Sequence, residues 1–227
     1  TEGLRAMNYR QVAALTTDQL AEFTTAHFAA LETEDIKRLS VDQLNAFSTE
    51  VIASMGTDAI QTLSRDQLEG LSSDQFQAMT STQIRALTDT QIKYMTSTQL
   101  NRLGSDQIDA LETSDIALLS GSQLAGLTAE VVELLSTDHI AALSSRQFKE
   151  LGSTQLNAMS SDQWQAIGTD VISALSASQI ADLGTSQIAD LTTDQVGALN
   201  YRAIDGMTQD QIESLETEDL AVFSERQ

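Results

Sequence analysis

The stretch SRDQLEGL at residues 64–71 decides the fold, because the same eight-residue pattern returns along the whole chain. It reads Ser or Thr, a variable residue, Asp or Thr, Gln, an Ile-type residue, a variable residue, a small residue and Leu; TTDQVGAL at residues 192–199 is another clean copy. Apolar residues fill the last position of every octad from Met7 to Phe223, and the fifth position from Val12 to Leu220. No insertion or deletion breaks this phase, so the chain is a repeat array.

The polar half of the octad carries two signals for the start of a helix. Ser or Thr followed three residues later by Gln is a capping box, in which Ser64 is the N-cap and Gln67 the third helical residue. Leu63 before the cap and Leu68 after the box have the spacing of a hydrophobic staple. Asp66 lies in the first turn, where a negative charge favours the helix dipole. Nearly every octad is therefore expected to open a new short helix.

Some octads depart from the pattern at the cap position. Glycine replaces Ser or Thr there at Gly56, Gly104, Gly152, Gly168 and Gly184. Glycine is a tolerable N-cap, and it is also favoured just past a helix end, so both properties predict it at this position. Glutamate occupies the cap position at residues 32, 112 and 216, and the octad pattern does not account for it.

The predicted fold is all-α: a solenoid or superhelix of very short capped helices, one per octad. One long amphipathic helix is disfavoured, because an eight-residue period moves the apolar stripe by roughly 80° per octad. A β-solenoid is disfavoured, because the apolar spacings are three and five and not two. A disordered chain has no reason to keep two apolar positions filled in every octad. Residues 1–227 are expected to form a single octapeptide-repeat solenoid, a segment of a longer array.

Composition narrows the function classes. The chain has 33 acidic and 12 basic residues and a net charge of −21, which disfavours binding to nucleic acid or to anionic membranes. It lacks cysteine, so disulfides and thiolate metal sites are excluded. No apolar run approaches the length of a membrane span, so membrane insertion is not expected. The few aromatic side chains predict a thin aliphatic core, with Phe28, Phe76, Phe148 and Trp164 as core residues at the fifth octad position.

No catalytic, cofactor-binding or metal-binding residue is predicted. His27 and His139 stand where Gln is usual and have no ligand partner at metal-binding spacing, so they are interpreted as substitutions at a semi-exposed position. The recurring Asp is attributed to helix-dipole compensation and not to calcium. The chain contains no catalytic triad, phosphate-binding glycine loop or zinc signature. We therefore expect no cofactor and no enzymatic activity.

The variable positions are where binding would be encoded. Adjacent hydroxyl pairs such as Ser72-Ser73 and Thr192-Thr193 are expected to form rows in which the second hydroxyl is free. Such a row could meet ice or a glycan, although Arg65 and Gln209 at the second position interrupt it. The tripeptide Asn-Tyr-Arg occurs at residues 8–10 and again at residues 200–202.

The octads STDHIAAL at residues 136–143 and TTDQVGAL at residues 192–199 resemble octapeptide arrays of large proteobacterial proteins of the secreted or cell-surface adhesin type. The resemblance covers nearly the whole chain, and it implies an extended array at the cell surface or outside the cell, with cytoplasmic location left open. It carries no catalytic residue over. Arg, Tyr and Glu in the variable positions depart from the purest arrays.

The expected function is a structural or adhesion-associated solenoid that acts as a spacer or scaffold. Two alternatives stay open: a solenoid that binds a protein or peptide, and a hydroxyl-row surface that binds ice or glycan. The expected partner is an unidentified protein or glycan, with self-stacking along the array as a further prediction.

Overall fold

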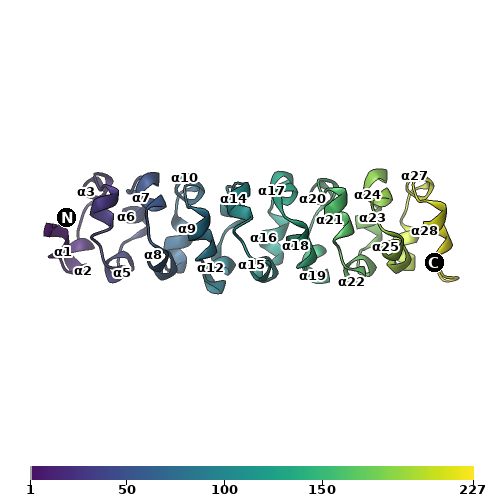
Figure 1. The fold of residues 1–227 in the computed structure, drawn as a ribbon, viewed down its shortest axis with the longest axis horizontal. Coiled ribbons are helices and arrows are strands. Elements are labelled where there is room, and N and C mark those ends of the chain that lie inside the picture. Colours follow the sequence, from purple (N-terminus) through teal and green to yellow (C-terminus); the bar gives the residue numbers. More distant parts are fainter. Residues whose placement is uncertain (1) are drawn as a thin grey trace. The chain divides into compact units, whose positions relative to one another are not determined.

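The computed structural model describes residues 2–227, and the described chain is entirely helical, with 28 short helices and no strand. This confirms the predicted all-α solenoid of short helices. The helices, labelled in Figure 1, belong to two compact units, Thr1–Glu112 and Thr113–Gln227. Each unit contains half of the helices.

The first unit contains helices α1 to α14. Their bounds are α1 Glu2–Arg5, α2 Tyr9–Val12, α3 Thr17–Ala21, α4 Thr25–Phe28, α5 Thr33–Ile36, α6 Val41–Asn45, α7 Thr49–Ala53, α8 Thr57–Thr62, α9 Arg65–Gly70, α10 Ser73–Gln77, α11 Ser81–Arg85, α12 Asp89–Tyr94, α13 Ser97–Leu100 and α14 Ser105–Ile108. The second unit contains α15 Thr113–Leu118, α16 Gly121–Ala125, α17 Ala129–Leu134, α18 Thr137–Ala141, α19 Ser145–Phe148, α20 Ser153–Asn157, α21 Ser161–Gln165, α22 Thr169–Ser173, α23 Ala177–Ala181, α24 Thr185–Ala189, α25 Thr193–Ala198, α26 Tyr201–Asp205, α27 Gln209–Glu213 and α28 Thr217–Ala221.

The helices begin where the capping box predicts. Before α9, Ser64 is extended, with φ −69° and ψ 168°. Its hydroxyl accepts a hydrogen bond from the Gln67 amide at 3.2 Å, and its own amide donates to the Gln67 side-chain carbonyl at 2.9 Å. The same reciprocal pair recurs in most octads and satisfies two of the amides that a helix N-terminus leaves without an intrahelical partner.

Glycine at the cap position acts only as an N-cap. Gly56 has φ −69° and ψ 158°, and no glycine in the described chain has a positive φ. The left-handed conformation that glycine often adopts after a helix end does not occur at this position. The extended backbone of the next cap already terminates the preceding helix, so no left-handed residue is needed.

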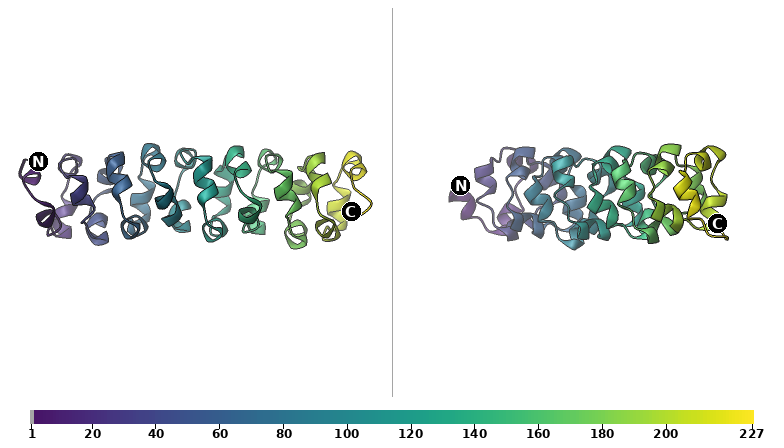
Figure 2. Two further views of the ribbon diagram at one scale, coloured as in Figure 1. Left: turned by 90° about the horizontal axis from the view of Figure 1, so that it is seen from below. Right: turned by 45° about the vertical axis from the view of Figure 1, so that its right-hand side comes forward.

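Within each unit, successive turns of the superhelix stack on one another (Figure 2). A helix packs on the helix three places earlier in the chain, as α9 packs on α6 in the first unit and α25 on α22 in the second. Hydrogen bonds between turns join residues 28 to 31 apart, such as Gln67 with Leu39 and Ile36. One turn therefore takes about 28 residues, or about three and a half octads.

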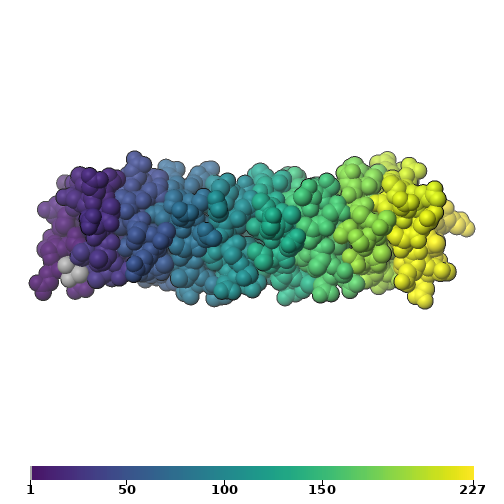
Figure 3. Space-filling view, turned by 90° about the horizontal axis from the view of Figure 1, so that it is seen from above, coloured from purple at the N-terminus to yellow at the C-terminus, as the bar shows by residue number. Residues whose placement is uncertain are grey.

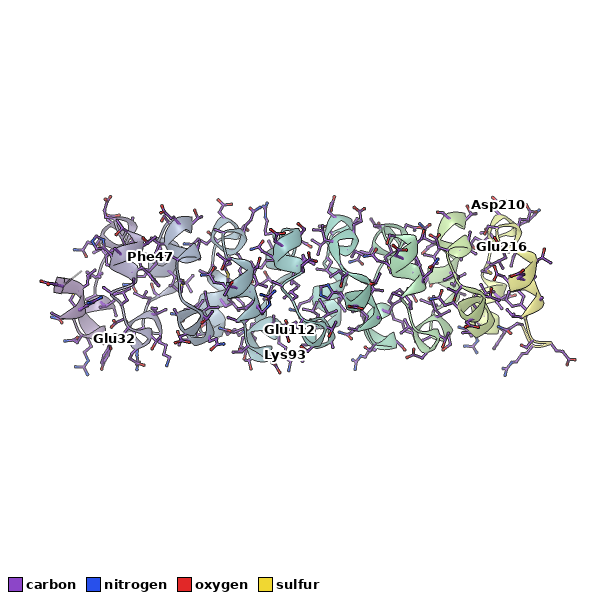
Figure 4. The ribbon with its side chains drawn as sticks, viewed as in Figure 1. Glu32, Phe47, Lys93, Glu112, Asp210 and Glu216 are labelled. Atoms are coloured by element: carbon purple, nitrogen blue, oxygen red, sulfur yellow. The ribbon has the colours of Figure 1, made fainter. Side chains whose placement is uncertain are left out.

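The two apolar series form the core of both units. From Ile36 to Leu199, every residue of both series is buried. Phe47, labelled in Figure 4, is one of them at 3% exposure. Near the two ends of the chain some members are partly exposed, and Leu220 is 43% exposed.

The aromatic residues at the fifth octad position are core residues, as predicted. Phe28, Phe76, Phe148 and Trp164 are all buried. Phe148 and Trp164 meet edge to face with ring centroids 6.1 Å apart, a favourable aromatic geometry.

None of the helices in residues 2–227 has the length and apolar character required to cross a membrane.

Candidate functional site

The glutamine at the fourth octad position joins two turns of the superhelix. In Gln163 the side-chain Oε1 accepts from the Ser160 amide at 2.8 Å, which completes the capping box. Its Nε2 donates to the carbonyl oxygens of Val132 and Leu135 at 2.8 and 2.7 Å. Leu135 follows the last residue of α17 and its carbonyl lies beyond the reach of the helix's own amides, whereas the Val132 carbonyl also accepts from the Leu135 amide at 3.2 Å. A single side chain therefore satisfies a helix start and a helix end at once.

This contact between turns recurs along both units. Nε2 donates to at least one carbonyl 28 to 31 residues earlier in Gln43, Gln67, Gln75, Gln83, Gln91, Gln99, Gln107, Gln147, Gln155, Gln163, Gln187, Gln195, Gln211 and Gln227. Most of these side chains are buried, and a buried amide is favourable only when its donors and acceptor are satisfied. Gln179 departs from the rule, because its Nε2 is buried without a partner.

The two histidines serve as glutamine substitutes at the helix start. Nδ1 of His27 accepts from the Thr24 amide, and Nδ1 of His139 from the Ser136 amide, both at 3.3 Å. His139 is only 5% exposed, so the expected semi-exposed position is wrong for it, although His27 is partly exposed. Within the described residues, no group of three or more His, Cys, Asp or Glu side chains is arranged to hold a metal ion.

Glutamate at the cap position accompanies aspartate at the fourth position. The pairs are Glu32 with Asp35, Glu112 with Asp115 and Glu216 with Asp219, and aspartate occurs at no other fourth position. The Glu32 amide donates to the Asp35 carboxylate at 2.9 Å, and the Glu216 amide donates to the Asp219 carboxylate at 3.2 Å. The three glutamates, labelled in Figure 4, are exposed. A carboxylate accepts at the helix start but has no N–H group for the preceding turn.

Where valine or alanine takes the fourth position, an acidic residue usually precedes it. Examples are Glu130 before Val131 and Asp170 before Val171. The carboxylate of Glu130 accepts hydrogen bonds from its own amide and from Thr128, which lowers its pKa. These octads therefore keep a negative group at the helix start but lose the amide that reaches the preceding turn.

Two second-position residues, Val41 and Arg65, contact the next turn of the superhelix. Because a turn takes about three and a half octads, adjacent octads point in different directions around the superhelix. Val41 meets Gly70 of the next turn, and the Arg65 guanidinium lies 5.0 Å from the Tyr94 ring centroid. Both pairs are 29 residues apart. Figure 3 shows one face of the protein surface, coloured along the sequence.

The surface hollows are open and shallow. One in the first unit, of about 210 Å³, is lined by Tyr9, Glu32, Glu34 and Asp35 among others. Two in the second unit have volumes of about 490 and 550 Å³. Hydroxyl, amide and guanidinium groups line these two hollows.

Comparison with known proteins identifies a repeat family. The family model described as "ALTTAQ repeat" matches residues 28–65, 71–105, 108–145 and 165–201, together about two thirds of the chain. Each matched segment spans more than four octads. No curated protein matches the chain.

Proposed function

Because the chain belongs to the ALTTAQ repeat family, we propose that this repeat-based scaffold acts as a structural spacer and not as an enzyme. The supporting observation is the glutamine contact between turns, which recurs at a fixed sequence interval in both units. A solenoid in which each turn makes the same contacts has a length set by its number of repeats. The proposed setting is a secreted or cell-surface protein of adhesin type, as the octad resemblance implies.

The spacer proposal predicts that the distance between two labelled residues grows in proportion to the number of octads between them. The chain contains no cysteine, so spin labels can be attached to Cys introduced at Asp18 and Asp74, both exposed and both in the first unit. They lie 56 residues apart, which is two turns of about 28 residues. A tandem duplication of residues 19–74, with the second label on the second copy of Asp74, should double the separation measured by electron spin resonance and keep the distribution narrow. A broad distribution, or a separation that does not grow with the duplication, would contradict the proposal.

The two alternatives differ in their support. A flat hydroxyl row for ice or glycan requires second-position hydroxyls in line, and successive octads turn them away from one another. A binding solenoid requires variable residues of one kind gathered on one face, and a groove of the second unit has this property.

A further inference from the structure

A groove in the second unit collects residues from four places in the sequence. It has a volume of about 550 Å³ and is lined by Lys149, residues 173–177, residues 200–202 and Arg226. These segments are spaced by about one superhelical turn, so the stacking of turns brings them together. The volume lies within the range of about 300–1,000 Å³ that is usual for small-ligand sites.

The groove is cationic in a strongly acidic protein. Lys149, Arg202 and Arg226 line it, whereas no aspartate or glutamate does. Elsewhere, Lys37 and Arg38 pair with Glu34. Within the described chain, none of the three groove cations pairs with a carboxylate, although the sequence has 33 acidic and 12 basic residues. Three unneutralised cations repel one another, and an anion placed between them would relieve that repulsion.

The aromatic wall of the groove is held in place before any ligand arrives. Arg202 Nε donates to the Tyr201 hydroxyl at 2.9 Å, and the Arg226 guanidinium lies 4.9 Å from the Tyr201 ring centroid. The hydrogen bond from Arg202 lowers the pKa of the Tyr201 phenol, and Arg226 acts in the same direction. Asn200 donates to the carbonyls of Ser173 and Leu175 at 3.0 and 2.9 Å, which fixes this segment on the turn below.

Two related places in the chain lack the same charge. Asn8-Tyr9-Arg10 repeats the local geometry, with Arg10 Nε donating to the Tyr9 hydroxyl at 3.2 Å, but Glu32, Glu34 and Asp35 line the hollow beside it. Arg146 lies 56 residues before Arg202 in an otherwise similar groove, and Glu150 lines that groove. Both provide matched controls within one molecule.

We infer that the groove of Lys149, Arg202 and Arg226 binds a short acidic saccharide, of one to three sugar rings carrying carboxylates. Two guanidinium groups match the geometry of carboxylates, and the Tyr201 ring offers an apolar contact to a sugar ring. The Ser173 hydroxyl donates to the Asp170 carbonyl, so its oxygen is left to accept from a sugar hydroxyl. The net charge of −21 disfavours long polyanions, which would extend over acidic surface beyond the groove.

The test is isothermal titration calorimetry of the full chain with digalacturonate at low salt. Binding is expected, with at least tenfold weakening in Arg202→Gln and in Arg226→Gln, and with no measurable binding of the matched neutral digalactoside. Arg10→Gln and Arg146→Gln are the controls and should leave the affinity unchanged. Circular dichroism should show the same helix content in all variants, because every substituted side chain is exposed.

Three outcomes would overturn the inference. The first is no binding of digalacturonate at millimolar concentration. The second is equal binding of inorganic phosphate or citrate, which would mean that the groove selects charge and not a saccharide. The third is an affinity that falls with Arg10→Gln but not with Arg202→Gln, which would place the site elsewhere. None of these outcomes bears on the spacer proposal, which is tested by distance.

Discussion

At the scale of single residues, the contacts made at the fourth octad position explain why glutamine is the usual residue there. A primary amide has an acceptor and two donors on one planar group, and the structure uses the acceptor at a helix start and the donors at a helix end one turn below. Glutamate keeps the acceptor and loses the donors. Histidine keeps the acceptor on Nδ1, which accounts for its appearance at this position.

Replacing Gln75 by Glu is therefore expected to destabilise the protein by roughly 1–3 kcal/mol, because a buried carboxylate would face two carbonyl oxygens in place of donors. Gln19→Glu is the matched control. Gln19 makes the same capping box but is exposed and donates to no carbonyl in the described chain. Urea unfolding of the two variants measures the difference. Equal costs would show that the contact between turns adds no stability.

Asp219 offers the reverse experiment. It is 7% exposed and accepts from the Glu216 amide, but it has no donor for the preceding turn. Asp219→Gln combined with Glu216→Thr recreates the common octad and is expected to stabilise the protein by roughly 0.5–1.5 kcal/mol, the net value of an added hydrogen bond. A lower midpoint of urea unfolding than in the parent chain would contradict this expectation.

At the scale of the helix, the elements are too short to be stable alone. The helices in residues 2–227 have four to six residues, and nucleation makes isolated helices of that length unfavourable in water. They persist because each start is capped, each end is satisfied from a neighbouring turn, and the apolar positions are buried. Loss of a cap is therefore expected to destabilise the neighbouring turn as well as the helix that the cap starts.

Ser160→Ala is expected to cost about 1 kcal/mol in the free energy of unfolding, because the Ser160 hydroxyl accepts from the Gln163 amide at 3.3 Å. The neighbouring Ser161 is exposed and makes no hydrogen bond through its side chain in the described structure. Ser161→Ala should change stability by less than about 0.5 kcal/mol. Chemical unfolding followed by circular dichroism distinguishes the two variants, and the prediction fails if they are equally affected.

The sequence predicted the helix starts and the core but not the contacts between turns. Ser64 and Gln67 predict a helix start because they are hydrogen-bond partners only three residues apart. The two apolar series predict the buried positions without any knowledge of the superhelix geometry. The hydrogen bond from Gln67 to the Leu39 carbonyl depends on the number of octads per superhelical turn. That number is set by the angle between successive helices, which the sequence of one octad does not show. The pairing of Glu32 with Asp35, by contrast, was present in the sequence as an association between two positions of one octad.

At the scale of the whole molecule, we expect the phase of the octads to matter more for stability than their number. Deleting residues 72–79 removes one octad and preserves both apolar series, so the helix content per residue and cooperative unfolding should be retained. Deleting residues 72–75 leaves half an octad, so the turns before and after the deletion lose register with one another, and helix content and cooperative unfolding should both fall. Far-UV circular dichroism and thermal unfolding measure the outcome, and equal tolerance of the two deletions would be inconsistent with a continuous solenoid phase.

The most direct test of the central claim is hydrogen exchange of the glutamine side-chain amides, measured by nuclear magnetic resonance. If glutamines join the turns, the Nε2 protons of Gln67, Gln83 and Gln163 should exchange far more slowly than those of Gln19, because the former are buried and bonded to two carbonyls. Uniformly fast exchange in all four side chains would contradict the account.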